Sequence, residues 1–227
     1  MGDRVRRTSG VATATALVAA LVVAPSEGLG GTPEFVERLD GRSLGVAGAP
    51  ILLVEYSDFT CGFCRKFHDE TWPRIQARYV DTGKVRFLYR DYPRAFQGPG
   101  LNAALGSRCA DEQGRFWPMH DRLFRADGRL GMDDLRQYAT ELGLDSGRFS
   151  RCLNDARYSD DIFANREEGV NFGFRGTPGF LLLRTRPPRV EGGAPPRALV
   201  IPGAFPYQVF EEQIERLLAE REPRVDG

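Results

Sequence analysis

The stretch ILLVEYSDFTCGFC, residues 51–64, decides the fold of this 227-residue chain. It opens on an apolar run, residues 51–56, that is typical of a strand buried on both faces of a parallel or mixed sheet. A short polar segment then leads into Cys61-Gly62-Phe63-Cys64, and helical spacing of apolar residues follows. The stretch therefore predicts a strand that delivers a C-x-x-C motif to the first turn of a helix.

The two cysteines of this motif are predicted to form a redox pair. Unpaired amide groups and the helix dipole stabilise negative charge at a helix N-terminus, so Cys61 is expected to ionise readily and to attack disulfides. Cys64, one turn later, is placed to resolve a mixed disulfide. The alternatives are a structural disulfide or half of a zinc site. Zinc needs a second ligand pair, and Cys109 and Cys152 lie too far apart in sequence to form a second knuckle.

Outward from the motif, the pattern predicts a strand–helix–strand unit, a helical block and a return to strands. The first helix runs to about residue 79, and Pro73 is expected to kink or break it. A second strand covers residues 85–89, and residues 101–172 carry only helical patterns. Strands at 179–183 and 198–201 flank a long Pro- and Gly-rich loop, 184–197, and a final amphipathic helix starts at Pro206.

Composition and the N-terminus limit the function classes. The chain has 31 basic and 31 acidic residues, so it lacks the electrostatic footprint of a nucleic-acid-binding protein. With two histidines, no metal centre is expected. Arg4, Arg6 and Arg7 precede a short apolar run, 11–24, and residues 1–24 are therefore interpreted as a signal peptide. We expect an exported protein, in the periplasm, in the cell envelope or secreted, and an uncleaved membrane anchor is the alternative.

Cys109 and Cys152 are the remaining cysteine pair. Each lies on the apolar face of its predicted helix, so the two could meet, and export would allow a disulfide to persist. A structural disulfide is the preferred interpretation, ahead of two buried free thiols or a second redox relay. Closing a loop of this length would stabilise the fold by about 4 kcal/mol.

Three motifs together resemble the DsbA-like branch of the thioredoxin-fold thiol–disulfide oxidoreductases. They are EYSDFTCGFC at 55–64, FWPMHDRLF at 116–124 and GTPGF at 176–180. The resemblance implies an α/β thioredoxin fold, a central mixed sheet flanked by helices, with an all-helical insertion domain. It implies a thioredoxin-fold domain (43–94 and 174–222) and a helical insertion (95–173), which follow the signal peptide (1–24) and a flexible entry segment (25–42) interpreted from the residues themselves.

The resemblance also implies roles for single residues. Pro178 matches the cis-proline that faces the C-x-x-C motif, and Thr177 and Pro178 would present backbone to a substrate strand. Glu55 matches a buried acid that moves the proton of the second cysteine, and burial would raise its pKa. Gly62 and Phe63, between the cysteines, are expected to contact substrate. Because neither is an imidazole, Cys61 is expected to be less acidic than in the most oxidising members.

Several further side chains near the motif have two interpretations. His68 could tune the Cys61 thiol, but a partly exposed histidine without a role is preferred. His120 is interpreted as packing. Phe59, Phe63 and Phe180 could form an apolar collar for unfolded substrates, or belong to the core.

The sequence therefore predicts an exported oxidoreductase that exchanges disulfides with reduced, unfolded proteins and most readily introduces them. It would need no cofactor, and a membrane redox partner would reoxidise it; the oligomeric state stays open. The alternatives are a reductase or isomerase kept reduced by an electron donor, and a binding or chaperone module whose C-x-x-C is only structural. The direction depends on a few kcal/mol, since about 30 mV corresponds to 1.4 kcal/mol.

Overall fold

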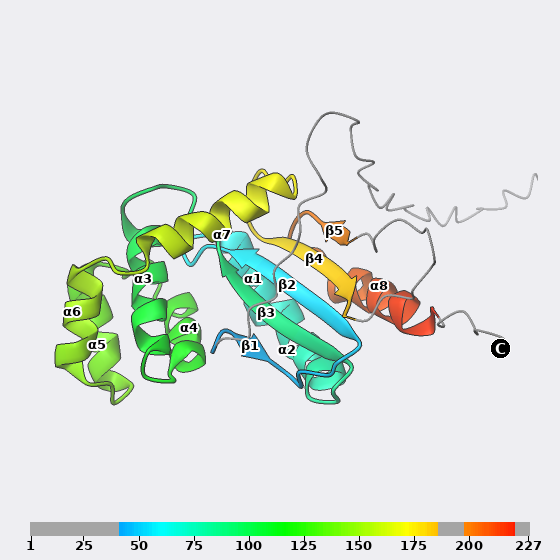
Figure 1. Ribbon diagram of the computed structural model, residues 1–227, viewed down its shortest axis with the longest axis horizontal. Helices are drawn as coiled ribbons and strands as arrows, with labels where there is room; N and C mark the ends of the chain where they lie inside the picture. Colours follow the sequence, from blue (N-terminus) through cyan, green and yellow to red (C-terminus); the bar gives the residue numbers. More distant parts are fainter. Residues whose placement is uncertain (1–40, 186–197, 221–227) are drawn as a thin grey trace, which may run out of the picture.

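A five-stranded mixed sheet forms the centre of the molecule in the computed structural model, which describes residues 41–185 and 198–220 (Figure 1). The strand order is β1-β3-β2-β4-β5. β2 and β3 are parallel, and the other neighbours are antiparallel. The strands are β1 (Ser43–Leu44), β2 (Ile51–Ser57), β3 (Val85–Asp91), β4 (Gly179–Arg184) and β5 (Leu199–Ile201). The predicted mixed sheet is confirmed, with β1 as a short edge strand that the sequence did not reveal.

The helical segment after the C-x-x-C motif continues past Pro73, so Pro73 does not break it, but the helix changes its geometry directly before the proline. It consists of α1 (Gly62–Lys66), the π-helical η1 (Phe67–Thr71), α2 (Trp72–Ile75) and the π-helical η2 (Gln76–Val80). Pro73 lies in the first turn of α2, where the missing amide proton has no intrahelical partner to lose. The change to π geometry before Trp72 therefore accommodates the proline without ending the segment.

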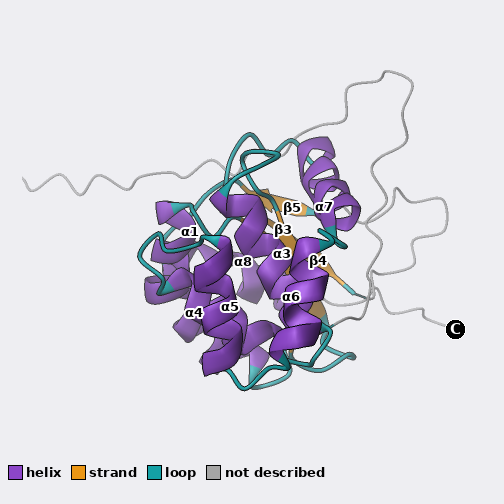
Figure 2. Ribbon diagram, turned by 90° about the vertical axis from the view of Figure 1, so that its left-hand side faces the viewer, coloured by secondary structure: helices purple, strands orange, loops and turns teal. Residues whose placement is uncertain are grey.

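A helical block is inserted between β3 and β4. It contains α3 (Pro99–Asp111), α4 (Phe116–Phe124), α5 (Met132–Glu141), α6 (Ser146–Asn154) and α7 (Ser159–Asn171). α3 to α6 stand beside the sheet, and α7 returns across its face (Figures 1 and 2). The last helix, α8 (Tyr207–Ala219), packs beside α2 on the other face. The predicted helical insertion is confirmed, while its boundaries at residues 95 and 173 stay predictions.

Because side chains alternate along β2, the two faces of the sheet pack against two different cores. Ile51 and Leu53 belong to the core that contains the aromatic residues of the motif helix and α8. Leu52, Val54 and Tyr56 point to the opposite face, into a cluster with Phe174 of the segment before β4. Glu55 therefore faces the same side as Ile51 and Leu53, toward the layer that carries the two motif cysteines.

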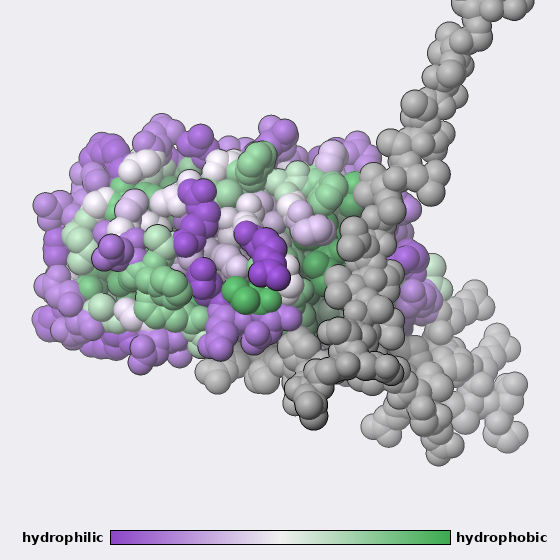
Figure 3. All heavy atoms as spheres, turned by 90° about the horizontal axis from the view of Figure 1, so that it is seen from above, coloured by the Kyte–Doolittle hydropathy of each residue, from purple (hydrophilic) through white to green (hydrophobic). Residues whose placement is uncertain are grey.

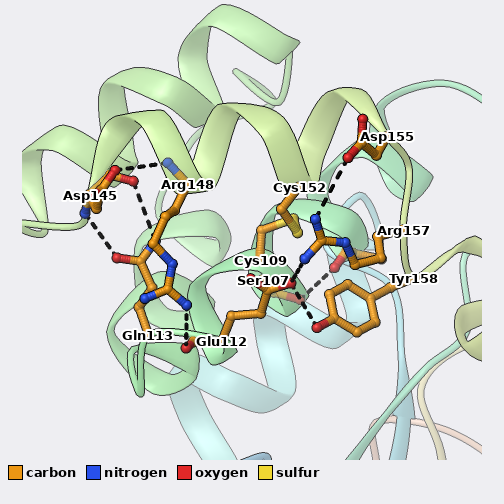
Figure 4. The surroundings of a disulfide bond; sticks show 11 residues. Ser107, Cys109, Glu112, Gln113, Asp145, Arg148, Cys152, Asp155, Arg157 and Tyr158 are labelled. Carbon is orange, nitrogen blue, oxygen red and sulfur yellow. Dashed lines mark hydrogen bonds and ion pairs between the residues drawn. A yellow bond between two sulfur atoms is a disulfide. The ribbon is translucent and has the colours of Figure 1, made fainter.

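The helical block has its own core, which a disulfide crosses. Cys109 of α3 and Cys152 of α6 are bonded and completely buried. Around this bond, Glu112 accepts hydrogen bonds from Arg157 and Tyr158 (Figure 4). Cys61 and Cys64 belong to the same apolar cluster as this disulfide, so the motif lies where the block meets the sheet.

Parts of the predicted organisation fall outside the described residues: the signal peptide, residues 25–40 of the entry segment, loop residues 186–197 and the end of the chain from residue 221. Arg42, the last residue of the predicted entry segment, is nevertheless buried and donates to Asn165 of α7. Within the described part of the chain, no helix is long and apolar enough to cross a bilayer. The face on the α7 side mixes polar and apolar residues (Figure 3).

Candidate active site

The turn between β2 and α1 fixes the position of Cys61. Asp58 is buried and accepts hydrogen bonds from the amide and the hydroxyl of Thr60, at 2.8 and 2.7 Å. It also accepts from the backbone amide of Arg94. The Cys61 amide donates to the Asp58 carbonyl oxygen, and Cys61 then caps α1 in an extended conformation. The local hydrogen bonds therefore hold the first cysteine at the start of the helix.

The two thiols are not bonded to each other in the structure, and their pKa values are shifted in opposite directions. A hydrogen bond from the Cys64 thiol, with the amides of Cys64 and Phe63, lowers the pKa of Cys61 to about 5 against the cost of desolvation. Burial raises the pKa of Cys64 well above its ordinary value, and Cys61 and Glu55 add to this effect. Cys61 keeps 6% exposure and Cys64 none. One proton is thus held on the inner sulfur while the outer sulfur is ionised, the arrangement that an attacking thiolate needs.

The loop before β4 closes over the outer sulfur. The Thr177–Pro178 peptide bond is cis, and the carbonyl oxygen of Thr177 lies 3.3 Å from Sγ of Cys61. Gly179 follows, and a Cβ there would collide with the ring of Phe174. The structure therefore brings Thr177 and Pro178, which the sequence placed more than a hundred residues away, against Cys61.

A groove of about 490 Å³ opens beside this contact. Its lining is mainly apolar and includes Phe63, Phe174, Thr177 and Pro178 together with the segment Pro202–Pro206. Phe59 and Phe180 are buried, so of the two interpretations of the three phenylalanines these two residues follow the core one. Phe63 is 68% exposed and faces solvent. Gly62 is exposed beside Phe63, with open space where a side chain would be. The groove offers an apolar surface next to the reactive sulfur.

Glu55 lies under the cysteines in the middle of the sheet. Its side chain is buried at 3% exposure, and desolvation raises its pKa to about 7. It influences the pKa of Cys64, so the two groups lie within electrostatic range of each other. A carboxyl group with a pKa near neutrality can accept and return a proton at physiological pH.

The two histidines form a cluster that the sequence interpretation missed. His68 is buried rather than partly exposed, and its two ring nitrogens lie 3.2 Å from carboxylate oxygens of Asp69 and Asp121. Nδ1 of His120 lies 3.0 Å from the same oxygen of Asp121. His120 therefore does more than pack. The signal was present in the sequence, since both histidines of the chain are followed by an aspartate.

This cluster has the donor atoms of a metal site. Ligand atoms of His68, His120 and Asp121 lie within 4.8 Å of one another. All three are already engaged in hydrogen bonds inside the cluster. Desolvation opposes ionisation of Asp121, but the hydrogen bonds from His120 and His68 prevail and hold its pKa well below the usual range. The cluster is therefore complete as a hydrogen-bonded unit.

A family model described as Thioredoxin matches residues 37–185. The chain is 35% identical over 135 residues to the Na+/H+ antiporter NhaA 3 of Salinispora tropica, a match that covers 59% of this chain and 20% of the antiporter. It is 27% identical over 149 residues to a Rickettsia bellii protein named "Putative protein-disulfide oxidoreductase", covering 61% of this chain and 55% of that protein.

The fold is also similar to a solved structure. The crystal structure of alpha-DsbA1 from Wolbachia pipientis matches with a TM-score of 0.66 and 26% identity, over 78% of this chain and 89% of that one. The match to the curated relatives spans only about a fifth to a half of their length. The likeness therefore concerns the domain that contains the two cysteines.

Proposed function

We propose, because this chain belongs to the thioredoxin family and its fold is DsbA-like, that it is a thiol–disulfide oxidoreductase acting through Cys61 and Cys64. The observation that carries the proposal is the asymmetry of the two thiols. Cys61 has a pKa of about 5 and touches the cis-proline loop, whereas Cys64 is fully buried and holds its proton. A low-pKa nucleophile with a shielded resolving thiol is the minimum needed for disulfide exchange.

The reaction uses the site as follows. A substrate thiolate attacks Sγ of Cys61 in the oxidised pair, the Cys61–Cys64 bond breaks, and Cys64 leaves with two electrons and takes a proton from Glu55. A second substrate thiolate attacks the substrate sulfur of the mixed disulfide and releases Cys61 as a thiolate. The substrate loses two electrons and gains a disulfide, and the enzyme gains the two electrons.

The direction of exchange that the site favours is oxidation of substrate. A stabilised Cys61 thiolate stabilises the reduced enzyme, and a couple whose reduced form is stabilised is a stronger oxidant. Turnover then requires an acceptor that reoxidises the pair. We assign the enzyme to an exported location, because residues 1–24 carry a basic stretch followed by an apolar one. The acceptor that we propose for this location is a membrane redox partner.

The substrates we propose are reduced, unfolded proteins. The backbone of Thr177 and Pro178 lies beside Cys61, where an extended segment could pair with it as an added strand. Phe63 and the apolar groove next to it would contact side chains flanking the substrate cysteine. Because an unfolded chain exposes such side chains and a folded one buries them, the groove favours unfolded partners.

A substrate protein with one cysteine pair, reduced and unfolded, tests the proposal. Oxidised enzyme should convert it to the disulfide form in a single turnover, measured by alkylation and mass spectrometry. Cys61→Ser should abolish the conversion. The matched variant Cys64→Ser should capture glutathione or substrate as a mixed disulfide on Cys61. If Cys61→Ser oxidised the substrate at the wild-type rate, catalysis through Cys61 would be refuted. If the enzyme rapidly reduced the substrate disulfide without net oxidation, it would be a reductase rather than an oxidant.

A further inference from the structure

The groove beside Cys61 contains a single charged side chain. Of the described residues that line the groove, only Arg175 carries a charge, and the others are phenylalanine, proline, glycine, alanine and threonine. Arg175 is exposed. In the part of the chain that the structure describes, it makes no hydrogen bond or ion pair. The N–H donors of its guanidinium group are therefore open to a molecule that binds in the groove.

Arg175 lies on the segment that reaches the reactive sulfur. It precedes Thr177 by two residues, and the carbonyl oxygen of Thr177 lies 3.3 Å from Sγ of Cys61. Phe63, two residues after Cys61, lines the same groove as Arg175. Residues on one face of an extended strand recur at every second position. A substrate strand whose cysteine lies opposite Thr177 would therefore place the residue two positions from that cysteine opposite Arg175.

Two acidic side chains beside the motif already have basic partners. Oδ2 of Asp58 lies 3.6 Å from Nε of Arg94, and Oδ1 of Asp127 lies 3.4 Å from Nη1 of Arg65. Both arginines are substantially exposed, so they add positive charge to the surface around the reactive sulfur. No acidic residue of the described chain lines the groove. The charge of Arg175 is therefore not cancelled inside the groove, and it favours a bound anion.

We propose that Arg175 selects substrate segments that carry an acidic residue two positions from the reacting cysteine in an otherwise apolar stretch. The proposal rests on the function proposed above and names the class of unfolded segment that the site prefers. The apolar side chains would pack in the groove against Phe63. The carboxylate would accept hydrogen bonds from the guanidinium fork of Arg175. Arg175 touches neither reacting sulfur, so it acts by binding the segment and leaves the exchange chemistry unchanged.

The position of Arg175 limits the size of the selection. The side chain is exposed, so water and salt screen its charge. An exposed ion pair changes a binding constant by about two- to fivefold. We therefore expect a preference among substrates rather than an absolute requirement for an acidic residue. A preference of this size decides which cysteine of an unfolded protein reacts first when several are exposed together.

Reduced peptides with two cysteines test the proposal. Glu, Gln or Lys is placed two positions before and two positions after each cysteine, which covers both directions of the bound strand. Oxidised wild-type enzyme and Arg175→Gln are mixed with each peptide at pH 7 and low salt, and the second-order rate of peptide oxidation is measured by acid quench and mass spectrometry. Lys84→Gln is the matched control, because Lys84 is exposed and precedes β3 at the end of the sheet opposite the motif.

The ratio of the Glu-peptide rate to the Gln-peptide rate should be about threefold higher for wild-type enzyme than for Arg175→Gln. Comparing this ratio between enzymes removes the effect of each peptide's charge on its own thiols. Arg175→Glu should favour the Lys peptide instead, and all differences should shrink in about 0.5 M salt.

The rate with the Gln peptide shows whether each variant is folded and active. Lys84→Gln should keep the wild-type ratio. Equal ratios in wild-type enzyme and Arg175→Gln, or an equal loss in Lys84→Gln, would overturn the selection by Arg175. If wild-type enzyme oxidised none of the peptides, the proposed function itself would be overturned.

Discussion

The reduction potential of the Cys61–Cys64 pair should change its dependence on pH at about pH 5, where the Cys61 thiol ionises. Below that pH, reduction takes up two protons with two electrons. Above it, Cys61 is reduced to a thiolate, while Cys64, whose pKa is well above its ordinary value, still takes a proton. Each proton contributes about 30 mV per pH unit to a two-electron potential. The slope should therefore fall from about 60 to about 30 mV per pH unit.

The same ionisation sets the size of the effect at neutral pH. A pKa of about 5, against an ordinary value of 9.0, stabilises the reduced enzyme at pH 7. The stabilisation is about 2.7 kcal/mol, which makes the couple about 60 mV more oxidising. Because the folded pKa is depressed, this stabilisation is complete only above the unfolded pKa and is lost as the pH falls through 5. Between pH 5 and pH 7, the free energy of unfolding should shift by about 2 kcal/mol in favour of the reduced enzyme over the oxidised one.

Thiolate absorbance of the reduced enzyme and equilibration in glutathione buffers measure these two quantities. Cys64→Ala provides the matched variant, because the hydrogen bond from Cys64 is the largest cause of the depressed pKa. Its loss should raise the pKa of Cys61 by about 1–2 units, the value of a hydrogen bond to a charged group. Titration of wild-type Cys61 near 9, or a slope that stays near 60 mV per pH unit up to pH 8, would refute the reasoning.

Three further predictions test the supporting structure. Glu55→Gln should slow resolution of the mixed disulfide about 10²-fold, yet at pH 8 it should raise the free energy of unfolding by about 3 kcal/mol. The reason is that the buried carboxyl has a pKa of about 7, so its ionisation costs stability as the pH rises through 7. A variant less stable than wild type in urea at pH 8 would contradict this. Replacing Cys109 and Cys152 by alanine opens a loop with a sequence separation of 43 and should cost about 4 kcal/mol in urea denaturation. The Cys61 pKa should not change, and a changed pKa would show that the disulfide also shapes the site. Gly179→Ala should cost about 1–3 kcal/mol because its Cβ meets the ring of Phe174, and a stability equal to wild type in the same assay would argue against that close contact.

The sequence predicted most of the fold because its signals are local. Apolar runs of strand length located β2 and β3, and spacing at helical intervals located the block between β3 and β4. The two-residue strand β1 has too few residues for a pattern, since it exists only through pairing with β3. Of the kink or break expected at Pro73, the break does not occur for a related reason: the π turn before Trp72 places the proline in a new first turn, and spacing alone does not record such a change of geometry.

The sequence predicted the residues of the site that belong to a contiguous motif and missed those that meet only through a tertiary contact. Cys61 and Cys64 can be recognised by their C-x-x-C spacing. His68 and Asp121 are 53 residues apart, on η1 and α4, and their hydrogen bond depends on how the helical block packs against the motif helix. The one local signal, an aspartate directly after each histidine of the chain, does not tell which distant side chains will meet. The burial that makes His120 neutral is likewise a property of packing.

The helical block therefore contributes to the chemistry as well as to the shape of the molecule. Cys61 and Cys64 share an apolar cluster with the residues of α3 and α4, so the block supplies much of the burial that raises the pKa of Cys64. A thiol that holds its proton so strongly cannot resolve a mixed disulfide unless the proton has somewhere to go. The same packing brings His120 and Asp121, both on α4, into hydrogen-bonding distance of each other, and Asp121 also lies within 3.2 Å of His68 of the motif helix. Desolvation of the inner thiol and the histidine–aspartate cluster thus have one structural origin, the docking of α4 against the motif helix.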